Sequence, residues 1–195
     1  MARLARLVRR RHNRPAEPSM VMIDAQTVRG GRGGRTFHEQ GGKGGNTRGT
    51  KRSILIEILG LPLAVRVDSA KPHDVSAGRR LLDDHLADLP RVSAIVADRG
   101  YTGLSTLAAR NHLALDIKRP LKPAPAAVAP GQRPKKPKRV FTPIAPLYKV
   151  ENAFARLGTW RRLSRCYEGT PESARAWLEV ACLGYLLGRL RVEPT

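Results

Sequence analysis

Apolar residues in the first part of the chain fall into short, β-branched runs. Residues 21–28 (VMIDAQTV) surround a single acid, Asp24, and predict a buried strand. Residues 53–60 (SILIEILG) and 61–70 (LPLAVRVDSA) predict two more strands, and the glycine and proline at their junction favour a hairpin. The pattern therefore predicts three consecutive strands.

The next part of the chain alternates between helical and strand patterns. Leucines at helical spacing predict a helix over 73–89, and the apolar run of 92–100 (VSAIVADRG) predicts a strand ending at Asp98. A helix over 101–112 and a strand over 113–119 follow. This order predicts an α/β fold: a mixed sheet with an antiparallel three-strand start and then parallel strands, flanked by helices.

A proline-rich basic segment divides the C-terminal part of the chain. Residues 120–146 contain eight prolines and predict a semi-rigid linker rather than core. Apolar residues at helical spacing then predict a helix over 149–163, with Glu151 beside its apolar stripe, and another over 171–190. The residues of the last helix expected in the core are Trp177, Val180, Leu183, Tyr185 and Leu187.

The net charge of the chain indicates the kind of partner that it binds. The chain of 195 residues has 36 Lys and Arg against 16 Asp and Glu, a net charge of +20. Nucleic acid is the usual partner of such a surplus, because each phosphate contact releases condensed counterions, and an acidic membrane is the weaker alternative. Two basic segments stand out, an N-terminal arm over 1–20 and a loop over 29–49 with nine glycines. Between the arm and residue 190 we expect one compact domain, residues 21–190.

Several function classes are excluded by composition. Cys166 and Cys182 are the two cysteines, too few and too far apart for a disulfide framework or a zinc ribbon. No apolar stretch is long enough to span a bilayer, so we expect no membrane segment. These features indicate a reducing compartment, and we expect a cytoplasmic, nucleoid-associated protein.

Three acids lie in apolar surroundings: Asp24 in a strand, Asp98 at a strand end and Glu151 beside a helix stripe. Any one of them could pair with an arginine, because buried charges need partners. Together they favour a site, since strand ends of an open sheet are where sites form. Three carboxylates suit two Mg²⁺ ions, which can clamp the attacking and leaving oxygens of a phosphodiester.

Ordered segments around these acids resemble the DDE transposases of bacterial insertion sequences. They are IDAQTV at Asp24, GGKGGNTRGTKRSILIEILGLPLAVRVDSAKPHD, VADRGYTG at Asp98, and KVENAFARLGTWRRLSRCYEGTPESA around Glu151. The resemblance covers about residues 18–190 and implies a ribonuclease-H-like fold, with the first Asp on the first strand, the second after the fourth strand and the Glu on a late helix. The strand and helix order predicted above has the same arrangement.

The resemblance also implies an activity. Asp24, Asp98 and Glu151 would be the catalytic, metal-binding triad, holding two Mg²⁺ ions with Mn²⁺ as a substitute. The enzyme would cleave DNA and transfer the cut strand in transposition of an insertion sequence, working as a homo-oligomer on double-stranded element ends and target. Family members usually carry an N-terminal region of domain size, so we expect that region to be missing here, and an upstream reading frame could supply it.

Seven cations are candidates for contacts to DNA phosphates. Four lie at the mouth of the glycine-rich loop, which leads directly from the Asp24 strand, and three follow Glu151, where a solvated helix end is the alternative. They are Lys43, Arg48, Lys51, Arg52, Arg161, Arg162 and Arg165.

Two other functions stay open at this point. The chain could be an inactive transposase remnant that acts only as a basic DNA-binding protein, with steeply salt-dependent binding and no Mg²⁺ or Mn²⁺ site. It could also be a hydrolytic nuclease of the same fold, which cuts DNA but does not join a 3′ end to a target.

Overall fold

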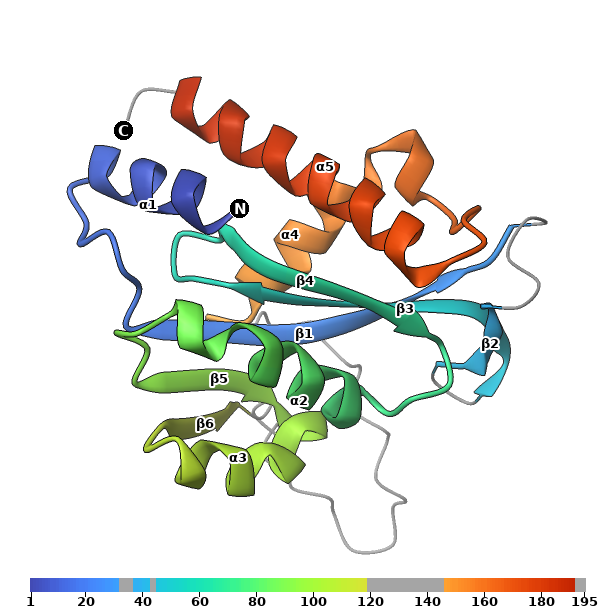
Figure 1. Ribbon diagram of the computed structural model, residues 1–195, viewed down its shortest axis with the longest axis horizontal. Coiled ribbons are helices and arrows are strands. Elements are labelled where there is room, and N and C mark those ends of the chain that lie inside the picture. The colour runs from blue at the N-terminus through green and yellow to red at the C-terminus, as the bar shows by residue number, and fades with distance from the viewer. Residues whose placement is uncertain (32–36, 43–44, 119–145, 192–195) are drawn as a thin grey trace, which may run out of the picture.

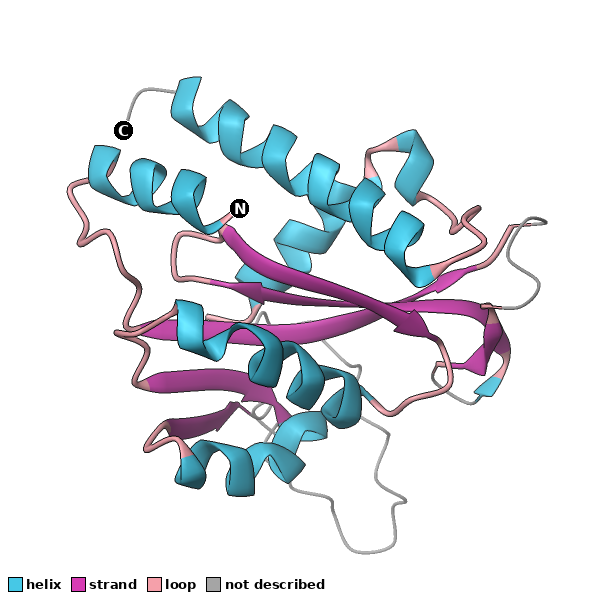
Figure 2. Cartoon of the chain, in the orientation of Figure 1, coloured by secondary structure: helices cyan, strands magenta, loops and turns pink. Residues whose placement is uncertain are grey.

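The structure, a computed structural model, describes residues 1–31, 37–42, 45–118 and 146–191. At its centre lies one mixed sheet, shown in Figures 1 and 2. The strands of the sheet in the described residues are β1 (Met20–Arg29), β2 (Glu39–Gly41), β3 (Thr47–Ile56), β4 (Pro62–Ser69), β5 (Ala94–Asp98) and β6 (Ala114–Lys118).

The strand directions confirm the predicted order. Strand β1 pairs antiparallel with β3, and β3 pairs antiparallel with β4, as expected for a hairpin start. On its other side β1 pairs parallel with β5, which pairs parallel with β6. The short strand β2 pairs with the beginning of β3. The result is a ribonuclease-H-like mixed sheet in which β1 joins an antiparallel half to a parallel half.

Helices cover both faces of the sheet (Figure 1). Helices α2 and α3 lie on one face, α4 and α5 lie on the other, and α1 lies beside α5. Short 3₁₀ turns extend or precede three of them. The helical segments are α1 (Ala2–Arg11), α2 (Asp74–His85), η2 (Leu86–Asp88), η3 (Arg99–Leu104), α3 (Ser105–Arg110), α4 (Tyr148–Gly158), η4 (Arg161–Leu163) and α5 (Pro171–Arg191).

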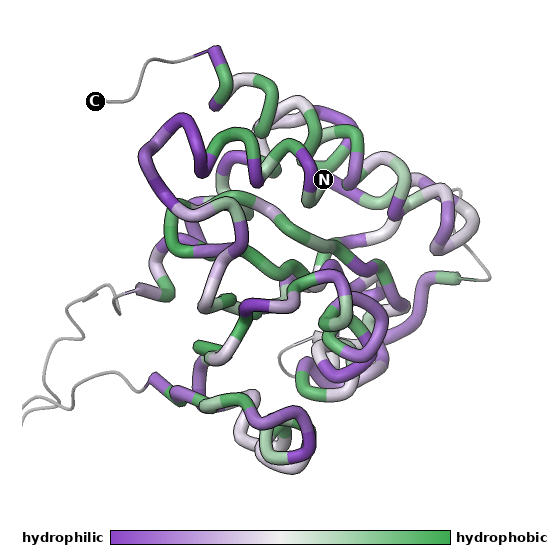
Figure 3. The backbone as a smooth tube through the Cα atoms, turned by 60° about the vertical axis from the view of Figure 1, so that its left-hand side comes forward, coloured by the Kyte–Doolittle hydropathy of each residue, from purple (hydrophilic) through white to green (hydrophobic). Residues whose placement is uncertain are grey.

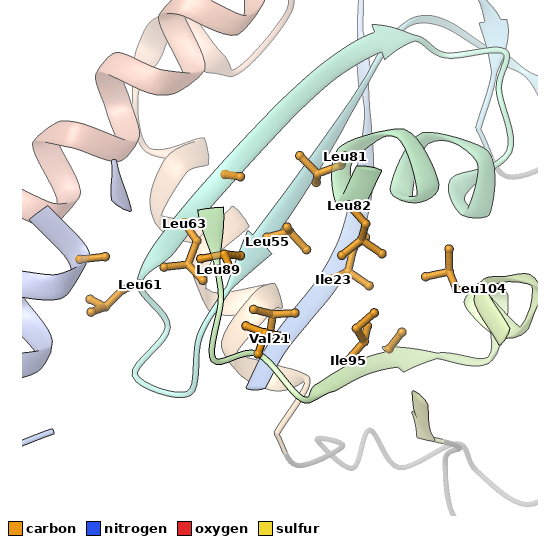
Figure 4. Packing of buried hydrophobic residues seen from close by; sticks show 14 of the residues in the cluster. Val21, Ile23, Leu55, Leu61, Leu63, Leu81, Leu82, Leu89, Ile95 and Leu104 are labelled. Carbon is orange, nitrogen blue, oxygen red and sulfur yellow. The ribbon is translucent and has the colours of Figure 1, made fainter. Parts of the chain in front are cut away.

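Two hydrophobic cores follow from the alternation of side chains along β1. Val21 and Ile23 point into the core beneath α2, part of which Figure 4 shows, whereas Met22 points into the core beneath α4 and α5. Figure 3 shows hydrophobic segments along the central strands and in the helices that cover them, and hydrophilic residues on several outer turns. Both faces of β1 are therefore buried at its amino half.

Two predicted segments differ from the structure, and a third is not tested by it. Residues 1–20 contain helix α1, which packs Ala5 and Val8 against the rest of the protein, because its apolar residues recur at helical spacing. The glycine-rich segment 29–49 contains β2 and the first residues of β3, although 32–36 and 43–44 lie outside the described residues. The linker expected over 120–146 also lies outside them, except for its last residue.

The predicted core face of α5 is wrong at three positions. Trp177, Val180 and Leu187 are 42, 48 and 49% exposed. The buried face instead carries Ala174, Leu178, Ala181, Cys182 and Leu186. Apolar residues occur all around this helix, so periodicity alone does not select a face, and the small side chains of the buried face let the helix approach β4 closely.

An ion pair is buried where α1 meets the end of β3. Glu57 is fully buried, and its Oε2 atom accepts a hydrogen bond from the Arg9 guanidinium, itself buried. Its Oε1 atom accepts from the backbone N–H groups of Leu59 (2.7 Å) and Leu61 (3.2 Å). Both carboxylate oxygens are thus satisfied inside the protein.

Candidate active site

Asp24 and Asp98 occupy equivalent positions on the neighbouring parallel strands β1 and β5. The pairing of these strands ends at Met22 with Val96, and each aspartate comes two residues later. Because side chains alternate, each points to the same face as Met22 or Val96, the face covered by α4. Beyond this point β1 stays paired with β3 and β5 with β6, so the strands separate and form a fork. In open α/β sheets, such a switch point at the carboxyl ends of strands is where ligands bind.

Glu151 approaches the same region from helix α4. It lies in the first turn of α4, between Val150, which packs into the core with Met22, and the exposed Asn152. Helix α4 packs against β1, and Glu151 itself is exposed. The apolar stripe of α4 therefore fixes the helix on the sheet and leaves the carboxylate outside the core.

The electrostatics of Asp24 show that several acids share one space. Burial raises the pKa of Asp24 from 3.8 to about 7. The backbone N–H of Ala25 donates to its Oδ1 atom (2.7 Å) and lowers the pKa, but the negative charges of Asp98, Asp74 and Glu151 each raise it further. The charges of Asp98 and Glu151, the other two acids of the sequence prediction, therefore both reach Asp24 in the folded chain. Asp24 is half-buried as expected, whereas Asp98 and Glu151 are exposed.

Two further residues of this region escaped the sequence prediction. Asp74, the first residue of α2, is a fourth acid near Asp24, and its Oδ1 atom lies 2.5 Å from the ammonium nitrogen of Lys51. Nothing in the sequence set it apart from the other acids of the helix predicted over 73–89. Tyr101 lies three residues after Asp98 and is 1% exposed, and its hydroxyl has no hydrogen-bond partner in the described residues. A tyrosine in a short helical segment carried no signal of either property.

The donor chemistry fits a divalent cation. Carboxylate oxygens are the ligands that hard cations prefer, and a cation would relieve the cost of ionising Asp24 beside Asp98 and Glu151. Within the described residues, no three His, Cys, Asp or Glu side chains stand close enough together to hold an ion as they are. Binding would therefore draw the carboxylates toward one another.

The cations predicted to contact DNA fall into two groups. Lys51 and Arg52 are 3 and 5% exposed: Lys51 contacts Asp74 and the Pro72 carbonyl, and Arg52 donates to the Leu163 carbonyl (2.6 Å). Both side chains are buried and already have partners inside the protein, so they are not available for contacts to DNA phosphates. We therefore do not carry these two forward as DNA contacts.

The remaining cations of that set are exposed where the structure describes them. Arg48 is exposed at the beginning of β3, and Lys43 lies outside the described residues. Arg161 and Arg165 are exposed, and Arg162 pairs with Glu168 (2.9 Å) and lies 5.1 Å from the ring centre of Trp177.

The segment that carries the later arginines is fixed beside the end of β1. The Cys166 N–H donates to the Arg29 carbonyl (2.9 Å), and the Gly31 N–H donates to the Cys166 carbonyl (2.6 Å). These arginines therefore lie along the edge toward which β1 runs after Asp24. In the helices that the structure describes, none has the length and hydropathy needed to cross a membrane.

Comparison with known proteins gives one match. The family model described as the transposase DDE domain matches residues 15–187, which is most of the chain. No curated protein matches the sequence.

Proposed function

The chain belongs to the transposase DDE-domain family, and on this premise we propose that it catalyses metal-dependent cleavage of DNA and transfer of the cut strand to a target. A transposase acts on DNA, and members of this family generally use divalent metal ions. The catalytic residues of the proposal are Asp24, Asp98 and Glu151. The observation that carries it is the equivalent placement of Asp24 and Asp98 at the fork of β1 and β5, with the charge of Glu151 reaching Asp24.

The proposed role of each acid follows from its position. Asp24 and Asp98, on neighbouring strands, would hold the ions jointly, and Glu151 on α4 would complete the second position. When bound, two Mg²⁺ ions, or Mn²⁺ in their place, would activate a water or a 3′-hydroxyl and stabilise the leaving oxygen of the phosphodiester. Since the pKa of Asp24 is about 7 without metal, this carboxyl would release its proton when it becomes a ligand.

The exposed arginines would hold the substrate. Arg161 and Arg165 lie along the edge where β1 ends, and Arg48 is the second residue of the adjacent strand β3. These cations would bind the phosphates of double-stranded element ends and target without reading their sequence. We also propose that the protein works as a homo-oligomer on DNA, in the cytoplasm at the nucleoid.

The test replaces each acid by its amide: Asp24→Asn, Asp98→Asn and Glu151→Gln. The substrate is duplex DNA from the flanks of the gene that encodes the chain, with Mg²⁺ or Mn²⁺ added. Each variant should lose cleavage and joining while binding DNA as the wild type does. The matched control is Asp88→Asn, because Asp88 is exposed at the other end of α2 from Asp74.

The outcomes separate the candidate activities. Cleavage that survives any of the three substitutions overturns the triad. Cleavage without joining assigns the chain to the hydrolytic nucleases. DNA binding with no metal binding and no cleavage in the wild type identifies an inactive chain.

A further inference from the structure

Tyr101 is enclosed directly behind the fork that carries the acids. It lies in η3, the turn that follows Asp98, and its ring packs against α2 at Gly78. A Cβ atom on Gly78 would stand 2.8 Å from Cε1 of Tyr101 and 2.9 Å from the Cδ1 atom of Ile23. Glycine at this position of α2 therefore leaves the space that the tyrosine ring fills, and the side chain is 1% exposed.

The hydroxyl of Tyr101 has an unusual environment for a buried group. It makes no hydrogen bond to the described residues, although a buried hydroxyl without a partner destabilises the fold and phenylalanine would fill the same space. Burial raises the pKa of Tyr101, and the charges of Asp24, Asp74 and Asp98 raise it further. The hydroxyl is thus a donor without an acceptor in the described residues, and the negative charges of three acids reach it.

The three acids differ in their partners. Asp74 is paired with Lys51 through Oδ1. Asp98 accepts from the Gly100 N–H (2.8 Å) and Asp24 from the Ala25 N–H (2.7 Å), each through Oδ1, so each keeps an Oδ2 atom with no hydrogen-bond partner among the described residues. Asp24 directly follows Ile23, whose side chain lies beside Gly78 together with the Tyr101 ring. Among the three, Asp24 also has the largest electrostatic effect on Tyr101. Because β1 and β5 separate at this point, no strand pairing closes the space between the α2 face and Asp24.

We propose that Tyr101 is a positioning residue for the catalytic site, whose hydroxyl donates a hydrogen bond to the Asp24 carboxylate when that carboxylate holds metal. The inference rests on the proposed function of Asp24. Tyr101 touches neither DNA nor metal; it fixes the orientation of a ligand. Such outer partners of metal ligands change metal affinity by about 10- to 100-fold when they are removed.

The test uses the full chain, Mn²⁺ as the probe and no DNA. Tyr101→Phe removes only the hydroxyl and keeps the ring in its enclosure. We expect Mn²⁺ affinity measured by calorimetry to fall about 10-fold, while the metal-free melting temperature stays unchanged or rises because an unpartnered hydroxyl is gone. A hydroxyl with a purely structural role would lower the metal-free melting temperature instead.

A spectroscopic measurement observes the hydroxyl itself. Mn²⁺ should produce a near-ultraviolet tyrosine difference spectrum in the wild type and none in Tyr101→Phe. The matched control is Tyr185→Phe, because Tyr185 lies on α5 near Gly60, in the turn between β3 and β4. That variant should keep both the spectrum and the affinity of the wild type.

Asp24→Asn distinguishes the two ways of failing. If Asp24→Asn abolishes Mn²⁺ binding while Tyr101→Phe binds as the wild type does, the inference about Tyr101 is wrong and the proposed function stands. If Asp24→Asn still binds Mn²⁺ with wild-type affinity, the metal role of Asp24 is wrong, and the positioning role of Tyr101 is wrong with it.

Discussion

Two acids, Glu57 just after the end of β3 and Asp24 within β1, have opposite electrostatic environments. Glu57 is fully buried, and Arg9 and two backbone N–H groups satisfy both of its oxygens. Asp24 is half-buried, accepts one backbone hydrogen bond, and has other acids rather than a cation as its electrostatic neighbours. The chain has more than twice as many cations as acids, yet none forms an ion pair with Asp24 in the described residues.

The difference between the partners of Glu57 and Asp24 separates an acid that stabilises the fold from an acid of a candidate functional site. A buried acid with a complete set of partners is part of the fold, and removing one partner damages stability. A buried acid kept among like charges costs stability, and such groups cluster at functional sites. The Glu57 environment is therefore complete in the chain alone, whereas in the proposed function a bound cation would complete the Asp24 environment.

The largest expected effect tests the Asp24 side of this contrast. Asp24→Asn should lower DNA cleavage by at least about 1000-fold, roughly 4 kcal/mol of activation free energy, because an amide does not replace an anionic ligand. The metal-free protein should be at least as stable as the wild type by urea unfolding. A variant that unfolds would show that Asp24 has the same structural role as Glu57 and would remove the contrast.

The second prediction tests the Glu57 side. Glu57→Gln should lower the free energy of unfolding by about 3–5 kcal/mol, because it leaves the Arg9 guanidinium buried without its counter-charge. Urea unfolding measures the loss. Adding Arg9→Met to the same chain removes the unpaired cation and should restore part of the stability; if it restores nothing, the ion pair is not the cause.

A third prediction concerns pH. The folded pKa of Asp24, about 7, lies above its unfolded value of 3.8, so the folded chain holds this proton more tightly, and this group lowers stability as pH rises through 7. Metal-free Asp24→Asn should therefore exceed the wild type in stability by on the order of 3 kcal/mol at pH 8. The difference should shrink toward pH 4.

Added metal tests the same contrast between Asp24 and Glu57. Mg²⁺ at pH 8 should raise the melting temperature of the wild type and leave that of Asp24→Asn unchanged, because the ion would supply the positive charge that no side chain supplies to Asp24 in the described residues. For the pH prediction, a metal-free stability difference between Asp24→Asn and the wild type that is equal at pH 8 and pH 4 would contradict the raised pKa of Asp24.

The smallest effect concerns the surface beside the site. Arg161→Ala and Arg165→Ala should each weaken DNA binding uniformly across sequences and reduce the slope of log affinity against log salt by about 1. Fluorescence anisotropy over a salt series measures that slope. Arg110→Ala is the control, since Arg110 pairs with Asp83 on α3 and α2. An unchanged slope would leave these arginines as a solvated surface.

Much of the fold could be predicted from the sequence because its strands are β-branched runs with few competing patterns. The order of strands and the helix α2 follow from local periodicity. The face of α5 could not be predicted, because that helix is apolar on all sides and only contact with β4 selects Leu178 over Trp177. The pairing of Arg9 with Glu57 was also hidden, since it joins residues 48 apart.

The site was predictable in part. Asp24 and Asp98 stood out as acids ending or interrupting apolar strands, but burial was the wrong reason for Asp98 and Glu151, which are exposed. The sequence could not separate Lys51 and Arg52 from surface cations, because their burial depends on the neighbours of β3 in the sheet. Tyr101 and Asp74 emerge only from tertiary contacts.

The fork between β1 and β5 also divides the sheet into two parts, which are joined by a shorter run of strand pairing than the run that joins β1 to β3. Eight residue pairs join β1 to β3, and three join β1 to β5. Proteins open locally, in cooperative parts, before they unfold globally. Because β5 is joined to β1 by few paired residues, the amides of β5 and β6 should exchange with solvent more readily than those of β3. Asp24 and Asp98 then belong to different cooperative units. An ion held by both carboxylates would connect the two units and oppose the local opening of β5 and β6.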